Sequence, residues 1–304
     1  MVSFTKQLTP KQFDFIKSKL SKYQIPKTTE HMIFAAQYLQ TKIFIYKTMK
    51  ILVQGKNVEK VLQYLTIKKP IEIDDQYGEI SYIGCDEVGT GDYFGGIVCI
   101  ACFVPKKDEQ TLKRLGVVDS KKLSNEEILK ITRKVTELQG EKKIGIEVGY
   151  KSVEPKEYNI LYDKCKNANV IKAICHNNAL SDACKLLKKN KSYKLGKNVK
   201  TVMDQFVNKN KYYEYLNKNC KPNSISEVNI FETKAESKYI SVALASIIAR
   251  AFFINQMNKI SQDLGIQVPF GSTDPKIKKI ASCIGRAYLN RYVKLHFRTT
   301  KELN

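Results

Sequence analysis

Residues 82–96 read YIGCDEVGTGDYFGG. The apolar run from Ile80 to Cys85 predicts a β-strand, and it ends in two adjacent carboxylates, Asp86 and Glu87, before a glycine-rich turn. A second apolar run over 97–104 predicts the next strand. Carboxylates at a strand end, beside backbone that can approach a ligand closely, suit divalent-metal and phosphate chemistry. Taken alone, the pair is equally compatible with a solvated turn, so the rest of the chain has to decide.

The net charge favours a polyanionic partner without deciding for one. The 304 residues contain 52 Lys and Arg against 30 Asp and Glu, a formal charge of +22. Cations that neutralise phosphates release counterions and so favour nucleic-acid binding. Only six of the cations are arginine, however, and such a lysine excess is also typical of a protein that is lysine-rich throughout.

The sequence predicts a cytoplasmic protein without a membrane span. Residues 1–6 lack the apolar core of a signal peptide, and no run of about 18 apolar residues occurs. The eight cysteines show no paired zinc-type spacing. Cys99 and Cys102 form one C-x-x-C, but both fall inside a predicted buried strand. We therefore interpret all eight as reduced thiols.

Residues 1–69 have the pattern of a separate, small basic domain. Thr9 before Pro10 predicts the start of a helix, and Asn57 predicts the cap of a second one. Strand-like runs lie between the two helices, at 32–37, 42–47 and 50–54. Residues 1–70 carry thirteen lysines against three carboxylates, a net charge of +10. Nearly half of the net charge thus lies in under a quarter of the chain.

Residues 70–79 reverse this charge and contain Pro70 and Gly78, which indicates a linker. Over 80–304 predicted strands and helices alternate, which favours an α/β domain. Ser124 with Glu127 forms the capping box of one predicted helix. The other expected helices cover 169–187, 239–264 and 274–301, and the later strands cover 144–148, 200–206 and 226–233.

Two further carboxylates stand out by their place in the predicted elements. Asp204 follows the apolar strand residues 201–203, and Glu236 lies between a predicted strand and a long helix. Acidic residues are usually solvated, but strand-to-loop positions can converge at one edge of a sheet. Two hard cations bound there would clamp the attacking and leaving oxygens of a phosphodiester, and carboxylates are the ligands that Mg²⁺ prefers.

Motifs along residues 80–300 resemble ribonuclease HIII, a bacterial member of the type 2 ribonucleases H. They are DEVGTGDYFG at 86–95, DSKKL at 119–123, DQF at 204–206, KAE at 234–236, the run 241–250 and KLHF at 294–297. The basic first domain also fits, since this family carries a TATA-binding-protein-like domain ahead of its catalytic domain. The resemblance implies a ribonuclease H-like mixed sheet flanked by helices over 80–304, preceded by a small α+β domain over 1–69.

The resemblance also implies an activity, the endonucleolytic hydrolysis of the RNA strand of RNA–DNA hybrids to 5′-phosphate and 3′-hydroxyl ends. Two divalent ions, Mg²⁺ or Mn²⁺, would be held by Asp86, Glu87, Asp204 and Glu236. Asp86 would bridge the two ions, with Asp204 and Glu87 on the leaving-group side and Glu236 beside the nucleophilic water. We expect a monomer without an obligatory protein partner.

Two alternatives stay open at this point. Ribonuclease HII-like cleavage at single ribonucleotides in DNA is disfavoured by Glu236, by the extra N-terminal domain and by Gly-Thr-Gly at 89–91 in place of Gly-Arg-Gly. A hybrid-binding protein without catalysis would be expected to lack one or more of the metal carboxylates, and all four are present.

Candidate substrate contacts lie in both predicted domains. Gly89, Thr90 and Gly91 are interpreted as a loop that reads RNA, because glycine lets main-chain groups approach the minor groove and its 2′-hydroxyls. The resemblance implies phosphate binding by Lys121.

In the first domain the strand alternation places Lys42, Phe44 and Tyr46 on one face, which is compatible with duplex binding, although Phe44 is equally compatible with a core position. We take Lys42, Lys47 and Lys56 as candidate contacts there.

Four other positions need an interpretation. Gly96 stands where the resemblance leads us to expect proline, which we interpret as a looser turn. Phe270 stands where a lysine is expected, which puts one phosphate contact in doubt. His176 and His296 are assigned structural roles, because hydrolysis with two metal ions needs no histidine.

Overall fold

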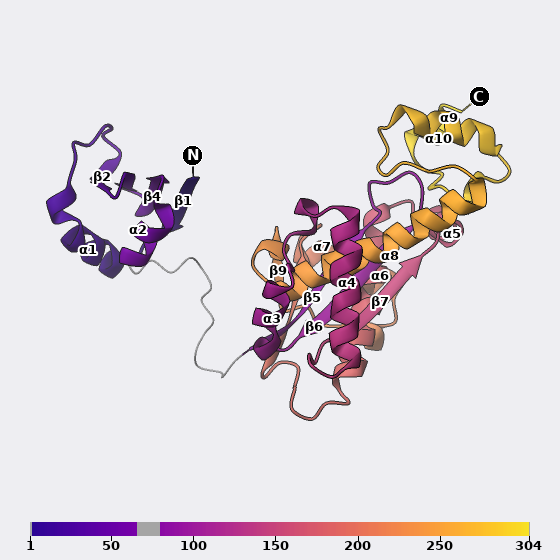
Figure 1. Cartoon of the computed structure of the whole chain (residues 1–304), viewed down its shortest axis with the longest axis horizontal. Coiled ribbons are helices and arrows are strands. Elements are labelled where there is room, and N and C mark those ends of the chain that lie inside the picture. The colour runs from indigo at the N-terminus through magenta and orange to yellow at the C-terminus, as the bar shows by residue number, and fades with distance from the viewer. Residues whose placement is uncertain (1, 66–79, 304) are drawn as a thin grey trace. The chain divides into compact units, whose positions relative to one another are not determined.

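The computed structural model describes residues 2–65 and 80–303. The chain divides into two compact units, residues 1–74 and 75–304, and each is described by itself. The predicted linker, 70–79, lies outside the described residues. Figure 1 shows both units and labels most of their helices and strands.

The first unit is a four-stranded antiparallel sheet with two helices on one face. Its strands lie in the order β1-β4-β3-β2. Helix α1 begins where the sequence predicts, because Thr9 and Gln12 form a capping box around Pro10. Strand β1 was not predicted. The elements are β1 (Val2–Gln7), α1 (Pro10–Lys19), β2 (Met32–Tyr38), β3 (Thr41–Tyr46), β4 (Lys50–Gly55) and α2 (Val58–Tyr64).

Strand β3 shows how this sheet has one buried and one open face. Ile43 and Ile45 are fully buried in a core that also contains Ile16 of α1 and Val61 of α2. The intervening Lys42, Phe44 and Tyr46 point to the other face and remain exposed or half-exposed. Within residues 2–65 both helices contribute to the same core, so the predicted face of Lys42, Phe44 and Tyr46 is confirmed as the open one.

The second unit is built on a mixed five-stranded sheet in the order β7-β6-β5-β8-β9. The central strand β5 pairs antiparallel with β6 and parallel with β8. The β8–β9 pair is parallel and the β6–β7 pair antiparallel. The parallel part therefore lies at β5, β8 and β9, whose carboxyl ends share one edge. The strands are β5 (Ser81–Val88), β6 (Ile97–Val104), β7 (Glu147–Val153), β8 (Val199–Asp204) and β9 (Ile230–Glu232).

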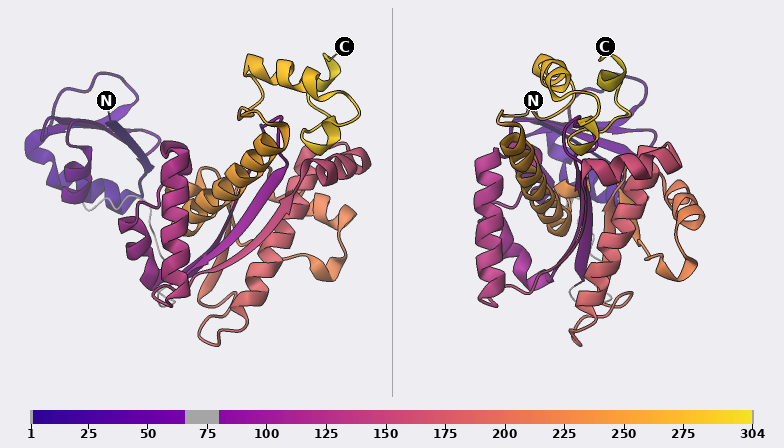
Figure 2. Two further views of the ribbon diagram at one scale, coloured as in Figure 1. Left: turned by 45° about the vertical axis from the view of Figure 1, so that its right-hand side comes forward. Right: turned by 90° about the vertical axis from the view of Figure 1, so that its right-hand side faces the viewer.

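Helices cover both faces of this sheet, as the two views of Figure 2 show. Helices α4 and α8 pack on one face and α6 on the other, and each face has its own apolar core. Gly84 lets α8 approach the backbone of β5, since an added Cβ would lie 2.2 Å from the Val242 nitrogen. The helices are α3 (Glu109–Arg114), α4 (Asn125–Gly140), α5 (Pro155–Cys165), α6 (Ala168–Leu187), α7 (Lys209–Asn219), α8 (Ile240–Leu264), α9 (Pro275–Ile284) and α10 (Arg298–Lys301).

Helix α8 is long and apolar enough to cross a membrane by length and composition, and among the described residues it is the one helix of this kind. It is mostly buried, and it packs along β5 and β6 as the central core helix. All eight cysteines are free thiols, and Cys99 and Cys102 are fully buried on β6, as predicted.

The prediction of one helix over 274–301 is wrong. Helix α9 ends at Ile284 because Gly285 follows with φ of +77°, a conformation that favours glycine. The chain then runs as turns to α10. His296 lies in these turns and stacks on Tyr162 with ring centroids 4.1 Å apart, so its predicted structural role is confirmed.

Candidate active site

Acidic side chains meet at the edge where the parallel strands end. The β5–β8 pairing runs up to Cys85 opposite Met203, so Asp86 and Asp204 are the next residues on neighbouring strands. Strand β9 brings the chain back beside Asp204, and Glu236 follows in the 3₁₀ turn Ala235–Ser237. Topology thus brings together three carboxylates that are far apart in sequence.

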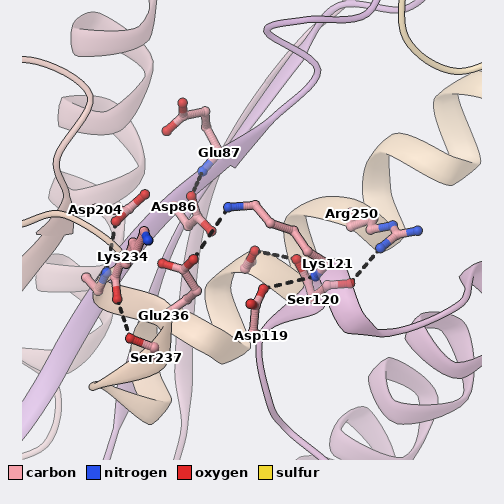
Figure 3. Close-up of polar contacts among 12 residues, drawn as sticks. Asp86, Glu87, Asp119, Ser120, Lys121, Asp204, Lys234, Glu236, Ser237 and Arg250 are labelled. Carbon is pink, nitrogen blue, oxygen red and sulfur yellow. Dashed lines mark hydrogen bonds and ion pairs between the residues drawn. The ribbon is translucent and has the colours of Figure 1, made fainter. Parts of the chain in front are cut away.

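A hydrogen bond from the backbone to the Asp204 side chain ties the Glu236 turn to the end of β8. The Ala235 amide donates to Oδ1 of Asp204 at 2.9 Å. Lys234, the residue before this turn, has φ of +57°, which reverses the chain direction. Glu236 Oε1 then lies 3.4 Å from Lys121 Nζ. Its second oxygen, Oε2, is buried and, among the described residues, has no hydrogen-bond partner. Figure 3 shows these side chains converging.

The environment of Asp86 disfavours its negative charge. Burial raises the pKa of Asp86 to about 8, and the nearby charges of Glu87 and Asp204 add to the effect. Burial likewise raises the pKa of Asp204, with further contributions from Glu236 and Glu87. A carboxylate is protonated rather than left buried without compensation. This edge of the sheet therefore has an excess of negative charge that a bound cation would offset.

Glu87 points the other way. Successive side chains of a strand lie on opposite faces, and Figure 3 shows the Glu87 carboxylate pointing away from that of Asp86. Its hydrogen-bond partners lie on α6. His176 Nε2 lies 2.9 Å from Glu87 Oε2, and Lys172 Nζ lies 3.1 Å from Oε1. Burial alone would raise the pKa of Glu87, but His176 and Lys172 outweigh it and lower the pKa to about 2.

The four predicted metal ligands therefore do not form one cluster in this conformation. Asp86, Asp204 and Glu236 lie on one side of β5, and Glu87 is paired on the other. In the part of the chain that the structure describes, no group of three or more His, Cys, Asp or Glu side chains is close enough to hold a metal ion.

Sequence reasoning missed Lys172 altogether and gave His176 only a structural role. The two residues lie one turn apart on α6 and are almost fully buried. Lys172 Nζ also lies 4.3 Å from the ring centroid of Phe206, on which the His176 ring stacks at 5.5 Å. A lysine and a histidine at i and i+4 on the buried side of a helix were the available signal, because buried charges are normally paired.

A loop held by α8 presents Lys121 to the acidic edge. Arg250 of α8 donates to the carbonyl oxygens of Ser120 and Leu123 at 2.6 and 3.0 Å. The hydroxyl of Ser120 lies 2.8 Å from that of Ser246, which in turn contacts Asp86. The Lys121 side chain is 79% exposed. It combines a contact with Glu236 and access to solvent, which is what a phosphate-binding lysine requires.

The predicted reading loop is a tight turn over the ring of Phe253. Gly89 has φ of +95°, and a Cβ there would lie 2.8 Å from Cε2 of Phe253. A Cβ added at Gly91 would have no neighbouring heavy atom within 4 Å, so the backbone there stays open to a ligand. Thr90 Oγ1 is buried and unpaired within the described chain. Lys294 holds the far side of the turn through the carbonyl oxygens of Asp92 and Gly95, at 2.6 and 2.7 Å.

Gly96 does not loosen this turn, contrary to the interpretation from sequence. Its amide donates to Gln256 Oε1 at 3.1 Å, a bond that proline cannot make. A Cβ at this position would also lie 1.7 Å from the Val153 carbonyl oxygen. The close approach of β7 therefore requires glycine.

The other predicted contacts lie on the first unit. Lys42 is on β3, Lys47 follows this strand and Lys56 follows β4. All three are exposed. None of the three belongs to α1 or α2, the helices that cover the buried face of the sheet.

Comparisons with known proteins cover both units. The family described as Ribonuclease HII matches residues 83–300, and a family described as a domain of unknown function (DUF3378) matches residues 3–72. Ribonuclease HIII of Streptococcus pyogenes serotype M49 (strain NZ131) is 36% identical over 297 residues, covering 94% of this chain and 92% of that protein.

Two solved structures are also similar to this chain over almost all of its length. The crystal structure of Bst-RNase HIII in complex with Mn²⁺ is 28% identical with a TM-score of 0.65, covering 99% of this chain and 97% of its own. That of Aquifex aeolicus RNase H3 is 25% identical with a TM-score of 0.53, covering 97% and 100%. The resemblance and the fold class predicted from sequence are thereby confirmed.

Proposed function

This chain belongs to the ribonuclease HII family, among its ribonuclease HIII members, and from this premise we propose that it cuts the RNA strand of RNA–DNA hybrids endonucleolytically. It is a ribonuclease H, hence a hydrolase. In the proposed reaction water attacks the phosphorus, and the bond to the 3′-oxygen breaks. The products carry 5′-phosphate and 3′-hydroxyl ends.

The convergence of Asp86, Asp204 and Glu236 carries this proposal. Divalent cations fit the site, because Glu236 Oε2 is buried without a partner among the described residues and the pKa of Asp86 is raised to about 8 by burial. Asp86, Glu87, Asp204 and Glu236 would hold two Mg²⁺ or Mn²⁺ ions. Such ions, when bound, supply Lewis-acid stabilisation and an activated water. The relative Bst-RNase HIII is known in complex with Mn²⁺.

Each carboxylate has a distinct task in this proposal. Asp86 follows Cys85 on β5 beside Asp204 of β8, so these two carboxylates would hold metal ions at this edge of the sheet. Glu236 keeps one oxygen free to orient the attacking water. Glu87 joins the set only when its carboxylate exchanges Lys172 and His176 for a cation.

The substrate contacts follow from exposure and backbone access. Lys121 is exposed beside Glu236 and would bind a phosphate near the cleavage site. The open backbone at Gly91, with Gly89 and Thr90, would approach the 2′-hydroxyls that distinguish RNA from DNA.

The predicted first domain, residues 1–69, would act as a substrate-binding domain through its open sheet face. Lys42 lies on that face. Lys47 directly follows β3, and Lys56 directly follows β4. We also infer that the protein works in the cytoplasm as a monomer.

Ribonuclease HII-like cutting at a single ribonucleotide in DNA is the second candidate, favoured by the match of that family to residues 83–300. Cleavage of a labelled long RNA–DNA hybrid, beside a DNA duplex with one ribonucleotide, separates the two. We expect efficient cutting of the hybrid only. Efficient cutting at the single ribonucleotide would instead support the ribonuclease HII-like activity.

The same assay tests the need for metal. Cleavage should stop in EDTA and return with Mg²⁺ or Mn²⁺. Hybrid binding without any cleavage under all these conditions would leave a binding protein.

A further inference from the structure

An exposed aromatic ring stands next to the glycine loop, and the proposed chemistry does not use it. Phe270 lies between α8 and α9, and 39% of its surface is exposed. Its ring meets the buried Phe253 of α8 edge-on, with centroids 6.0 Å apart. Exposed aromatic rings occur singly on many proteins, so exposure alone does not indicate a function and the position of the ring is decisive.

Phe270 is tied to the loop by hydrogen bonds on its neighbour. The Tyr93 amide donates to the Gly271 carbonyl oxygen at 2.9 Å. In return, the Gly271 amide donates to Oδ1 of Asp92 at 2.6 Å. These two bonds join the segment of Phe270 to the turn that holds Gly89, Thr90 and Gly91. The ring is therefore presented at a fixed place beside this turn.

Phe253 forms a floor under both elements. The same ring that lies 2.8 Å from a Cβ added at Gly89 or Gly95 supports Phe270. Phe270 and the glycine turn are thus neighbours on the same support.

Phe253, which supports Phe270, lies two helical turns from the residue beside Asp86. Ser246 contacts Asp86, and Phe253 follows seven residues later on the same helix. At 1.5 Å per residue this separation is about 10 Å along α8. A nucleotide other than the one that is cut is therefore the expected neighbour of Phe270.

Chemistry decides which sugar the ring would accept. A phenyl ring offers no hydrogen bond, so a ribose packed on it would lose the solvation of its 2′-hydroxyl. A deoxyribose has no such group and presents an apolar edge. Packing of this kind contributes affinity without neutralising a phosphate, and the contribution therefore does not depend on salt.

We propose that Phe270 is a substrate-contact residue that packs on a deoxyribose of the DNA strand, across the minor groove from the RNA strand at Gly89–Gly91. This inference rests on the proposed function as a hybrid nuclease. It adds a direct reading of the DNA strand to that function, by an apolar contact beside the loop that reads RNA.

The test measures the affinity of the full-length protein for an RNA–DNA hybrid against salt, in Ca²⁺, which permits binding but is expected not to support cutting. Phe270→Ser should weaken binding about tenfold at every salt concentration, within the range known for aromatic stacking on nucleotides. The slope of log affinity against log salt should not change. Phe270→Lys should instead steepen this slope by about 0.9, since it adds one phosphate contact.

Phe252→Ser is the matched control. Phe252 is equally exposed at 38% and lies on the same helix as Phe253, but its ring pairs with Tyr150 and not with the glycine loop. This variant should bind like the wild type. Phe270→Leu keeps apolar bulk on Phe253 without a flat ring, so it separates loss of the contact from loss of fold, and it should bind between wild type and Phe270→Ser.

An RNA–RNA duplex of the same sequence identifies the sugar. The serine variant should bind this duplex as the wild type does, because no deoxyribose is present. Equal weakening on both duplexes would overturn the assignment to the DNA strand, and wild-type affinity of Phe270→Ser for the hybrid would overturn the contact itself. Failure of the wild type to bind or cut the hybrid would instead refute the proposed function.

Discussion

The two sides of strand β5 place neighbouring carboxylates in opposite electrostatic surroundings. Asp86 faces other acids, and burial raises its pKa to about 8. Glu87, one residue later, faces Lys172 and His176, which overcome burial and lower its pKa to about 2. Both side chains are largely shielded from water, so burial is not what separates them. The sign of the charge that packs against each one is the difference.

The two sides of β5 therefore differ in what a bound cation would change. On the Asp86 side the exposed Lys121 contacts Glu236, and metal ions would offset the negative charge that remains. The Glu87 side already has its cations from the protein, so Glu87 can join a metal only by giving up two contacts.

The largest effect is expected on the Asp86 side. Asp86→Asn or Asp204→Asn should lower the turnover of the hybrid by about a thousandfold, because the carboxylates position the ions that stabilise the transition state, a contribution of several kcal/mol. Hybrid affinity in Ca²⁺ should change little, since it depends mainly on lysines. Turnover within tenfold of wild type for either variant would remove that residue from the proposed site.

The same substitution has an opposite effect on stability. The pKa of Asp86 is about 8 in the folded state, against an ordinary value of 3.8. The folded protein therefore keeps this proton to a higher pH than the unfolded chain does. The stability of the metal-free wild type should therefore fall as pH rises from about 4 to 8. Asp86→Asn lacks this loss, so in EDTA its melting temperature should rise relative to wild type over this range. A parallel course of the two proteins would contradict the charged environment assigned to Asp86.

The Glu87 side should respond in folding stability. Lys172→Met leaves a buried carboxylate with one partner fewer, and loss of one member of a buried pair typically costs about 3 kcal/mol. Adding Glu87→Gln should recover much of this cost, which urea unfolding in a double-mutant cycle measures.

Lys185→Met, on the same helix, is the control for Lys172→Met. Lys185 is 70% exposed and pairs with Asp182 at 3.0 Å, so it should cost less than about 0.5 kcal/mol. An equal cost at Lys172 and Lys185 would show that the Glu87 side is not the buried ionic site described above.

Neither side of β5 should be needed for the binding contribution of the first unit. Deleting residues 1–70 should leave the second unit folded, because its two cores contain no residue of the first. Hybrid affinity should fall, and the log–log salt slope should become shallower by roughly two to four, at about 0.9 per phosphate contact. The rate at saturating hybrid should hold. Superimposable salt curves would mean that Lys42, Lys47 and Lys56 do not touch the duplex.

Sequence predicted those parts of the molecule that local signals determine. The capping boxes of Thr9 and Ser124 marked helix starts correctly, because their hydrogen bonds reach only three residues along the chain. The convergence of Asp86 and Asp204 also followed, since both end parallel strands.

Long-range contacts explain what was missed. The partner of Glu87, Lys172, is 85 residues away, and no local pattern reports which face of α6 it meets. Strand β1 was missed because it is a short edge strand whose exposed Ser3 and Thr5 weaken its apolar signal. The helix expected over 274–301 is interrupted so that Lys294 can reach the glycine turn.

The smallest effect is expected at Lys294, a buried cation whose surroundings sharpen the contrast with Lys172. Lys172 has the carboxylate of Glu87, whereas Lys294 donates to two carbonyl oxygens, and burial lowers its pKa to about 7 from 10.5. Between these values the unfolded chain holds the proton and the folded protein does not, so stability from this group rises with pH and is lost as pH falls to 7.

Lys294→Met removes this dependence as well as the two hydrogen bonds. The variant should be less stable than wild type throughout, and the difference in unfolding free energy should grow by about 1 kcal/mol between pH 7.5 and 8.5. Urea unfolding at the two pH values measures it, and the comparison with wild type cancels the titration of every other group. If the cost of Lys294→Met were independent of pH, Lys294 would remain charged in the fold, and the distinction between a paired and an unpaired buried lysine would disappear.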